Sequence, residues 1–190
     1  MISRILILAA ASLVAFGTSP ALAAEFERSG YWEYQSKAVA ADGDETWYAC
    51  IASTRSLEET ELSLRLDPAA DNGFEAGMFL TNEAWDLGQE PLHVRLDIGA
   101  NRWMLKGQGD GNAVEVSWTG DSYFPRFLED FASSSFAALT ARDGTTIAKF
   151  SLSGSRKAIE AMKACVEEQI GQTVAEALKA EPSGDSTNPF

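Results

Sequence analysis

The sequence predicts a mainly β protein with some α structure. The expected fold is an antiparallel sandwich or barrel of about eight strands, with one short helix and a long C-terminal helix packed on the sheet. Three observations favour this class. Short runs alternate apolar with polar residues, turns containing glycine separate several of them, and an apolar stripe with steps of three or four follows near the C-terminus.

The first half of the chain contains four of the expected strands. Two are rich in aromatic residues, and two alternate apolar with polar side chains. Alternation directs successive side chains to opposite faces of a sheet, so one face is expected in the core and the other in water. These strands cover residues 31–34, 47–51, 62–66 and 92–98.

Two hairpins supply the other expected strands. In the first, the connection over residues 107–112 is rich in glycine, and these glycines are expected to supply positive φ angles. In the second, the turn contains Asp143-Gly144, a typical hairpin pair. The paired strands are 101–105 with 113–118, and 136–141 with 146–152.

A short helix is expected from Phe124 to Phe131, because its apolar side chains recur at i, i+3, i+4 and i+7. Pro125 is compatible only with the first turn of this helix, and Asp121 or Ser122 is expected to cap it.

A longer helix is expected from Ser155, as its N-cap, to about residue 180. Gly171 weakens this helix, which is expected to bend or fray after it. Cys165 borders the apolar stripe that faces the sheet. The stripe comprises Ile159, Met162, Val166, Ile170, Val174 and Leu178.

Residues 1–23 resemble a cleavable signal peptide. Arg4 precedes an apolar run from Ile5 to Phe16, and Ala21-Leu22-Ala23 is an A-x-A cleavage site. The run is well short of the roughly 20 residues that a membrane span needs. We therefore expect export to the periplasm or the medium, no membrane span in the mature form, one β-rich domain over residues 24–180, and a disordered tail over residues 181–190.

The two cysteines, Cys50 and Cys165, are expected to form a disulfide, because an exported chain matures in an oxidising compartment. The alternatives are two free buried thiols or a metal pair. His93 is the one histidine of the chain, and two thiolates with one histidine do not complete a zinc site.

The formal net charge of −13 argues against nucleic acid as a partner. Removal of Arg4 with the signal peptide makes the mature chain one unit more acidic. Such acidity is compatible with a basic protein or an envelope component as partner, although high net charge also serves solubility alone.

Catalytic patterns are weak in this sequence. His93 is expected on the outer strand face beside Arg95 and Asp97, as a solvated residue, and the serines of residues 151–155 do not form a nucleophile elbow. Glu129-Asp130 could contribute to a glycosidase pair, which the sequence alone does not place in a cleft.

We expect no metal site and no cofactor. Acidic stretches over residues 42–45, and Asp67 with residues 71–72, offer oxygen ligands for calcium. Neither has the spacing of a twelve-residue EF-hand loop.

The five tryptophans are expected mostly in the β core, where aromatic side chains contribute much buried area. Trp85 is the candidate for ligand binding, because residues 81–88 are typical of a loop or a strand edge. Asn82 lies in the same segment and is the second candidate binding residue.

Four segments of the chain occur in an order that is informative. They are Gly30-Tyr31-Trp32, Tyr48 to Ser53 around Cys50, Phe79 to Leu87, and Phe150 to Ser155 followed by Ala158 and Cys165. This order resembles a group of small, functionally uncharacterised periplasmic domains of Gram-negative bacteria, which stand alone after a signal peptide or are joined to trypsin-like protease domains. The C-terminal third is more distantly similar to proteins of the invasion-associated locus B type. The resemblance implies no known active site.

The sequence thus predicts a non-enzymatic, exported binding or accessory protein. One alternative is a periplasmic inhibitor of a basic lysozyme or protease, which an acidic face would recognise. A second alternative is a hydrolase that uses a pair of carboxylates.

Overall fold

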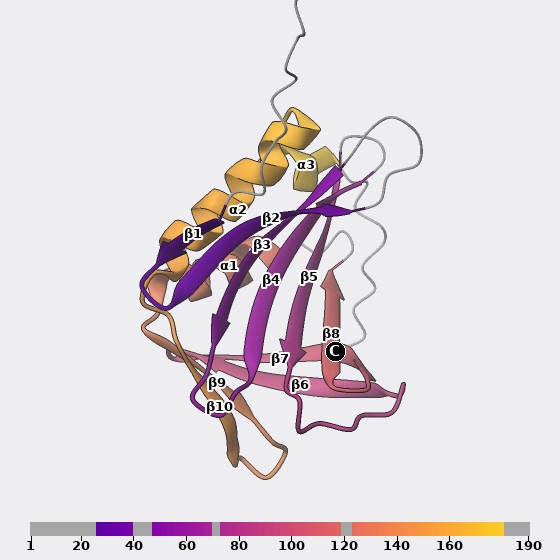
Figure 1. Ribbon diagram of the computed structural model, residues 1–190, viewed down its shortest axis with the longest axis vertical. Coiled ribbons are helices and arrows are strands. Elements are labelled where there is room, and N and C mark those ends of the chain that lie inside the picture. The colour runs from indigo at the N-terminus through magenta and orange to yellow at the C-terminus, as the bar shows by residue number, and fades with distance from the viewer. Residues whose placement is uncertain (1–25, 40–46, 70–72, 119–122, 181–190) are drawn as a thin grey trace, which may run out of the picture.

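A computed structural model describes residues 26–39, 47–69, 73–118 and 123–180. The expected signal peptide and C-terminal tail lie outside these residues. Within them the chain is mainly β, with ten strands and three helices (Figure 1). The elements are β1 (Phe26–Ser29), β2 (Trp32–Val39), β3 (Trp47–Arg55), β4 (Glu61–Pro68), β5 (Phe74–Thr81), β6 (Pro91–Ile98), β7 (Asn101–Asp110), β8 (Ala113–Trp118), α1 (Phe124–Ser133), β9 (Phe136–Thr140), β10 (Thr146–Ser151), α2 (Ser155–Ile170) and α3 (Val174–Ala180).

All ten strands belong to one antiparallel sheet, in the order β1-β2-β3-β4-β5-β8-β7-β6-β9-β10. The first and last strands do not pair, so the sheet is open, and the predicted sandwich or barrel of about eight strands is corrected to a single sheet of ten.

The two unpredicted strands are β1 and β5. In β5, the inward residues are Ala76, Met78 and Leu80. Their alternation is obscured because Phe79, on the other face, is also apolar.

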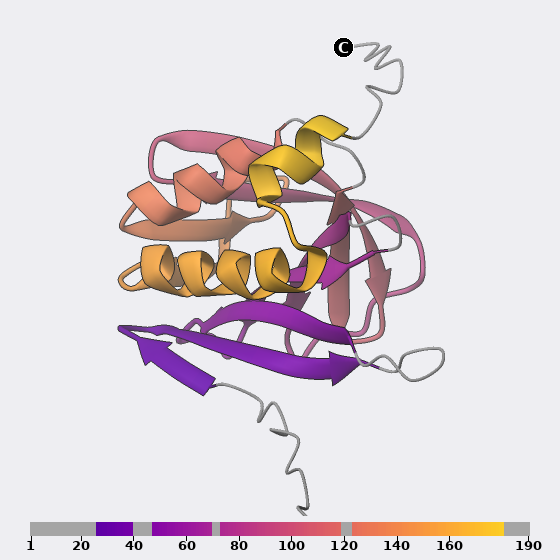
Figure 2. The same ribbon diagram turned by 90° about the horizontal axis from the view of Figure 1, so that it is seen from above.

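The sheet is strongly curled. Strands β6 and β7 run at a steep angle to β2–β5 (Figure 1), and helices α1 and α2 lie between β1–β2 and β6–β7 (Figure 2). The two ends of the sheet meet through individual hydrogen bonds. Tyr31 N donates to Ser153 O at 3.0 Å, and Trp32 Nε1 donates to Ser151 O at 3.0 Å.

Helix α1 fills the interior of the curl with aromatic rings. Phe127 packs on Trp118, with ring centroids 4.8 Å apart, and Phe131 packs edge-to-face on Trp32 at 6.0 Å. The predicted apolar face of this helix is therefore confirmed, as is Pro125 in the first turn. The proposed caps Asp121 and Ser122 lie outside the described residues.

The long C-terminal helix differs from its prediction in two ways. Gly154 occupies the N-cap position, whereas Ser155 is the first helical residue and its hydroxyl donates to Phe131 O at 2.8 Å. Gly154 is required because its φ is +97° and a Cβ there would lie 1.7 Å from Ser29 O. The helix ends at Gly171, and α3 is a separate short helix.

The predicted disulfide is confirmed. Cys50 and Cys165 have Cα atoms 5.9 Å apart and join the centre of β3 to α2 across 115 residues. Beside it, Gln169 binds the backbone of Tyr48 through both ends of its amide, at 2.8 Å and 2.9 Å. These contacts hold α2 against the sheet.

Candidate functional site

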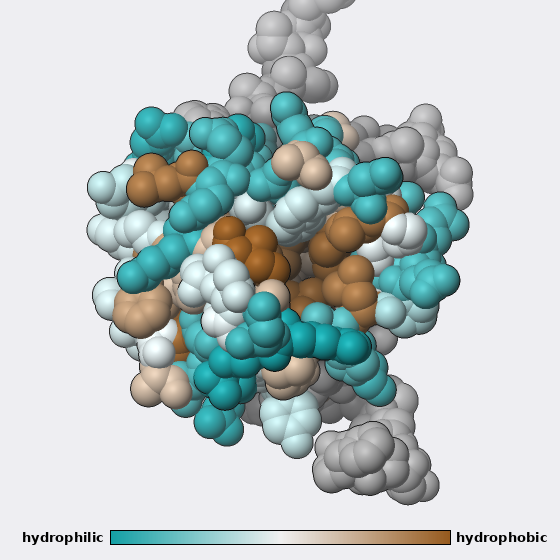
Figure 3. Space-filling model, turned by 90° about the horizontal axis from the view of Figure 1, so that it is seen from below, coloured by the Kyte–Doolittle hydropathy of each residue, from teal (hydrophilic) through white to brown (hydrophobic). Residues whose placement is uncertain are grey.

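The end of the curled sheet away from α3 contains a cavity of about 530 Å³. Figure 3 shows hydrophobic side chains around a hollow on this side of the molecule. The cavity lies between the loop that joins β5 to β6 and the hairpin of β9 and β10. It is lined by Leu80, Trp85, Leu87, Leu92, His93, Val94, Arg95, Arg102, Met104, Val114, Leu139, Thr140, Ala141, Arg142 and Ile147.

The opening results from unequal strand pairing along β6. This strand pairs with β7 over Pro91–Ile98, but with β9 only over Arg95–Ile98. Beyond Thr140 the β9–β10 hairpin separates from β6, and its ladder shifts register between Thr146 and Ala148. The stretch from Pro91 to Val94 is thus left without a partner strand on that side among the described residues, and the cavity passes beside it.

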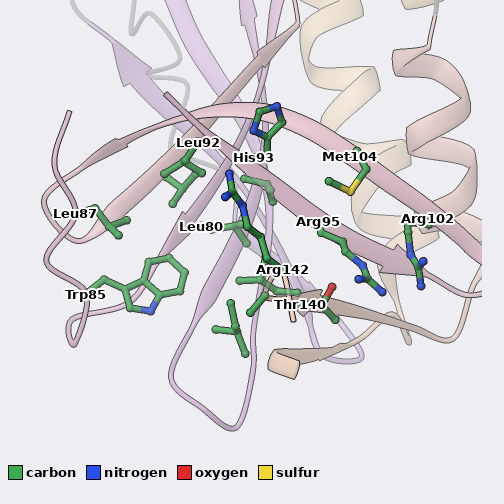
Figure 4. A pocket seen from close by; sticks show the side chains of 15 residues that line it. Leu80, Trp85, Leu87, Leu92, His93, Arg95, Arg102, Met104, Thr140 and Arg142 are labelled. Atoms are coloured by element: carbon green, nitrogen blue, oxygen red, sulfur yellow. The ribbon is translucent and has the colours of Figure 1, made fainter. Parts of the chain in front are cut away.

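Apolar side chains form the walls. Leu80 and Val114 reach the cavity from the inner face of the sheet, and Trp85 and Leu87 approach it from the β5–β6 loop (Figure 4). Leu87 anchors this loop, because its backbone exchanges two hydrogen bonds with Gly111, at 2.7 Å and 3.0 Å. The walls are therefore built on strands and on a fixed loop.

The two candidate binding residues predicted from the sequence, Trp85 and Asn82, differ in their position relative to the cavity. Trp85 lines the cavity, as a binding role requires. Asn82 is not among the lining residues. Its amide nitrogen donates to Glu58 O and Thr60 Oγ1, both at 2.9 Å, and its side-chain oxygen accepts from Ala84 N at 2.8 Å. Asn82 thus fixes the loop that carries the tryptophan.

The polar part of the lining is basic. It contains Arg95, Arg102, Arg142 and His93, and none of the lining residues is acidic. Arg142 extends across the cavity toward His93 (Figure 4), and no hydrogen bond or ion pair joins it to another described residue. His93 is exposed on the outer face of β6, as expected, but it also borders the cavity.

Arg95 and Arg102 share one carboxylate next to the cavity. Arg102 Nε lies 2.7 Å from Asp97 Oδ1, and Arg95 lies 3.4 Å from the other oxygen. The hydrogen bond from Arg102, with the charges of both arginines, lowers the pKa of Asp97 below its ordinary 3.8. Asp97 is therefore ionised at neutral pH and offsets one of the two positive charges.

Two hydrogen-bond donors at the cavity have no acceptor. Arg95 Nε and Thr140 Oγ1 are buried without a hydrogen-bond partner among the described residues. The two residues are direct neighbours on β6 and β9. An unsatisfied buried polar group costs roughly 1–3 kcal/mol, so two of them side by side indicate a place where an acceptor fits.

The sequence does not indicate this cluster, because Arg95 and Arg102 are at least 38 residues away from Thr140 and Arg142 along the chain. Each is an ordinary outward residue of an alternating strand or a turn. Only the pairing of β6 with β9 brings them together. A cluster of this kind leaves no local spacing that a motif could capture.

Two other residues considered as site candidates in the sequence, Asp130 and Asp67, form contacts that stabilise the fold. Asp130 accepts hydrogen bonds from Asn101 Nδ2 at 3.0 Å and Trp103 Nε1 at 2.9 Å, so it orients α1 on β7. Asp67 pairs with Arg65 at 2.6 Å. The remaining proposed calcium ligands lie outside the described residues. Within the described part of the chain, His, Cys, Asp and Glu side chains form no group of three that could hold a metal ion.

A second, smaller cavity of about 170 Å³ lies between α1, α2 and α3. Its lining includes Glu129 and Glu160 together with Arg156 and Lys163. Its charges are therefore mixed, in contrast to those of the larger cavity.

None of the helices in the described ranges is both long and apolar enough to cross a membrane.

Comparisons of the chain with models of protein families, with curated proteins and with solved structures found no match. The fold and the site are therefore interpreted from their own geometry, and the resemblance to small periplasmic domains stays a prediction.

Proposed function

We propose that this chain is an exported, non-enzymatic binding protein that holds a small, largely apolar molecule in the 530 Å³ cavity. The single observation that carries the proposal is the cavity itself. Its volume lies within the roughly 300–1,000 Å³ of small-molecule sites, and like them it combines apolar walls with a few convergent polar groups.

The position of the lining residues on rigid elements supports a cavity whose shape without ligand is close to its shape with ligand bound. Leu80 and Val114 belong to the central strands β5 and β8, and the loop with Trp85 is fixed by Asn82 and by the backbone pair of Leu87 with Gly111. A site on rigid elements loses little conformational entropy on binding. Trp85 adds a flat apolar surface for a ligand.

The signal-like residues 1–23 support an exported protein, and so does the disulfide between Cys50 and Cys165, which persists in oxidising compartments. The periplasm or the medium is the location we propose. There, a cavity that shields apolar surface would serve to carry or sequester a poorly soluble molecule.

The two alternatives from the sequence draw less support from this site. A hydrolase with paired carboxylates needs them in a cleft, and the cavity lining has none. An inhibitor of a basic enzyme needs an acidic recognition surface, whereas the cavity is bordered by arginines.

A neutral fluorescent probe, N-phenyl-1-naphthylamine, tests the proposal. Its emission should rise on addition of the mature protein, and the Ala141→Trp variant, which places an indole in the cavity, should abolish the rise. Ala164→Trp is the matched control, because this exposed residue lies on α2, away from the cavity. Equal probe binding by the wild type and by both variants would refute a ligand site in this cavity.

A further inference from the structure

Three arginines and a buried threonine hydroxyl supply most of the polar side-chain groups of the cavity. Arg95, Thr140 and Arg142 lie on or next to the paired ends of β6 and β9, whereas Leu80 and Leu87 come from β5 and its following loop (Figure 4). The cavity therefore has a polar, cationic part and an apolar part. A molecule complementary to both parts is an amphiphile.

The charge of this polar part is opposite in sign to the net charge of the chain. The whole sequence carries −13, yet the cavity lining has three arginines and no acidic residue. Asp97 offsets only one of the arginines, since Arg95 and Arg102 share it. At physiological salt, charges beyond about 8 Å are largely screened, so these nearby cations dominate what a bound head group experiences.

The two buried donors indicate the same ligand chemistry. Arg95 Nε and the Thr140 hydroxyl lack an acceptor, and Arg142 has no partner among the described residues. Thr140 is itself buried, with 8% of its surface exposed. A guanidinium fork matches the two oxygens of a carboxylate, and such charge-assisted hydrogen bonds are the strong ones. A quaternary ammonium head group has no acceptor for these donors, and a neutral head group forms only the weaker hydrogen bonds between uncharged acceptors and these donors.

We propose that the cavity selects single-chain amphiphiles with an anionic carboxylate head, which Arg95, Thr140 and Arg142 bind while the apolar tail lies among Leu80, Leu87 and Val114. This inference rests on the proposed binding function, which it makes specific: the ligand class is that of unesterified fatty acids.

Calorimetric titration of the mature protein with three tail-matched ligands tests the selection. The ligands are decanoate, decanol and decyltrimethylammonium, with the two ions kept below the concentrations at which they form micelles and decanol kept below its solubility limit. Decanoate should bind at least about tenfold more tightly than decanol, as expected for charge-assisted hydrogen bonds, and the cation more weakly still. Acetate should not bind measurably, because it lacks the tail.

The outcomes separate the two levels of the proposal. If none of the three ten-carbon ligands binds, the proposed function itself is overturned. If decanoate and decanol bind equally, the cavity is a binding site but the selection for an anionic head is wrong. Preferential binding of the cation would also overturn the selection.

Arg142→Gln locates the head group. This change removes a charge at the cavity without filling it, so decanoate should bind about tenfold more weakly while decanol is unaffected. Arg126→Gln is the matched control, because it removes the same charge from an exposed position on α1. If both variants weaken decanoate equally, the effect is one of net charge, and the assignment of Arg142 is refuted.

Discussion

Thr140 has a buried hydroxyl with no hydrogen-bond partner among the described residues, whereas Thr54, also buried and on β3, donates to Tyr31 O at 2.9 Å. Valine keeps the shape of threonine and removes the hydroxyl. Thr140→Val should therefore raise the free energy of unfolding by about 1 kcal/mol, and Thr54→Val should lower it by a similar amount. Urea denaturation of both variants measures the two changes. Equal destabilisation by both would show that the Thr140 hydroxyl is satisfied.

Asp97 should make stability depend on pH at the acidic end. Its pKa in the folded state is lowered, chiefly by the hydrogen bond from Arg102. A lowered folded pKa contributes stability that is present above the unfolded value and is lost as the pH falls through the folded value. Asp97→Asn should therefore be less stable than the wild type at pH 7, and the difference should begin to shrink as the pH falls below the ordinary 3.8 and disappear below the lowered folded pKa. Thermal unfolding of both proteins across this range tests it. A difference that persists unchanged at pH 2 would contradict the assigned ion pairs.

At the scale of residues, the sequence predicts a binding residue when its role depends on neighbours in the chain. It does not predict one whose role depends on residues brought close by folding. Trp85 was recognisable as a binding candidate because its segment is typical of a loop. The cluster of Arg95, Thr140 and Arg142 was not recognisable, because the pairing of β6 with β9 creates it. The sequence favours Asn82 as a ligand contact, and its anchoring role is not visible there because Glu58 and Thr60 lie 24 and 22 residues away.

At the scale of elements, the close approach of Gly154 to β1 should control the start of α2. In Gly154→Ala, the added Cβ meets Ser29 O at 1.7 Å and the backbone keeps a positive φ. Gly144→Ala shares the positive φ, +88°, but its Cβ meets nothing within 4 Å. Strained φ angles cost about 1–3 kcal/mol. The first variant should lose at least about 2 kcal/mol more stability than the second, since steric overlap is added. Similar unfolding midpoints for both would refute this close approach.

Strands with strict alternation and hairpins with clear turn residues were predicted well. The pair β9–β10 around Asp143-Gly144 is confirmed with nearly the expected bounds. The first hairpin was placed less well. Strand β7 continues to Asp110, and among the predicted turn glycines only Gly111 has a positive φ. Gly109 instead allows Gly88 O to approach within 2.7 Å of where a Cβ would lie. Close backbone contact and positive φ both favour glycine, and the sequence does not distinguish them.

At the scale of the whole molecule, one covalent link joins an early strand to the last long helix. Replacing both Cys50 and Cys165 with alanine should lower the free energy of unfolding by about 4–5 kcal/mol, because the chain-entropy model assigns this cost to a loop of that size. The sulfurs close a separation of 115 residues. Denaturation of the wild type with and without reductant checks the value. Identical midpoints in both conditions would contradict it.

The general class of fold followed from the sequence, but the closure of the sheet did not. Alternation shows that strands exist and which face is buried, and it carries no information on whether the outermost strands pair. Here β1 and β10 do not pair, and the β1–β2 turn is joined to the segment after β10 by the hydrogen bond from Tyr31 to Ser153. The cavity depends on a similar detail, the early separation of β9 from β6, and therefore could not be predicted from the chain alone.

The most direct test of a ligand site at this end of the sheet is the map of backbone amide shifts when decanoate is added to the mature protein. Our interpretation predicts that the largest shifts cluster at Trp85 and Leu87, from Leu92 to Arg95, and from Thr140 to Arg142. Shifts concentrated instead between α1, α2 and α3, or no shifts at saturating decanoate, would contradict it.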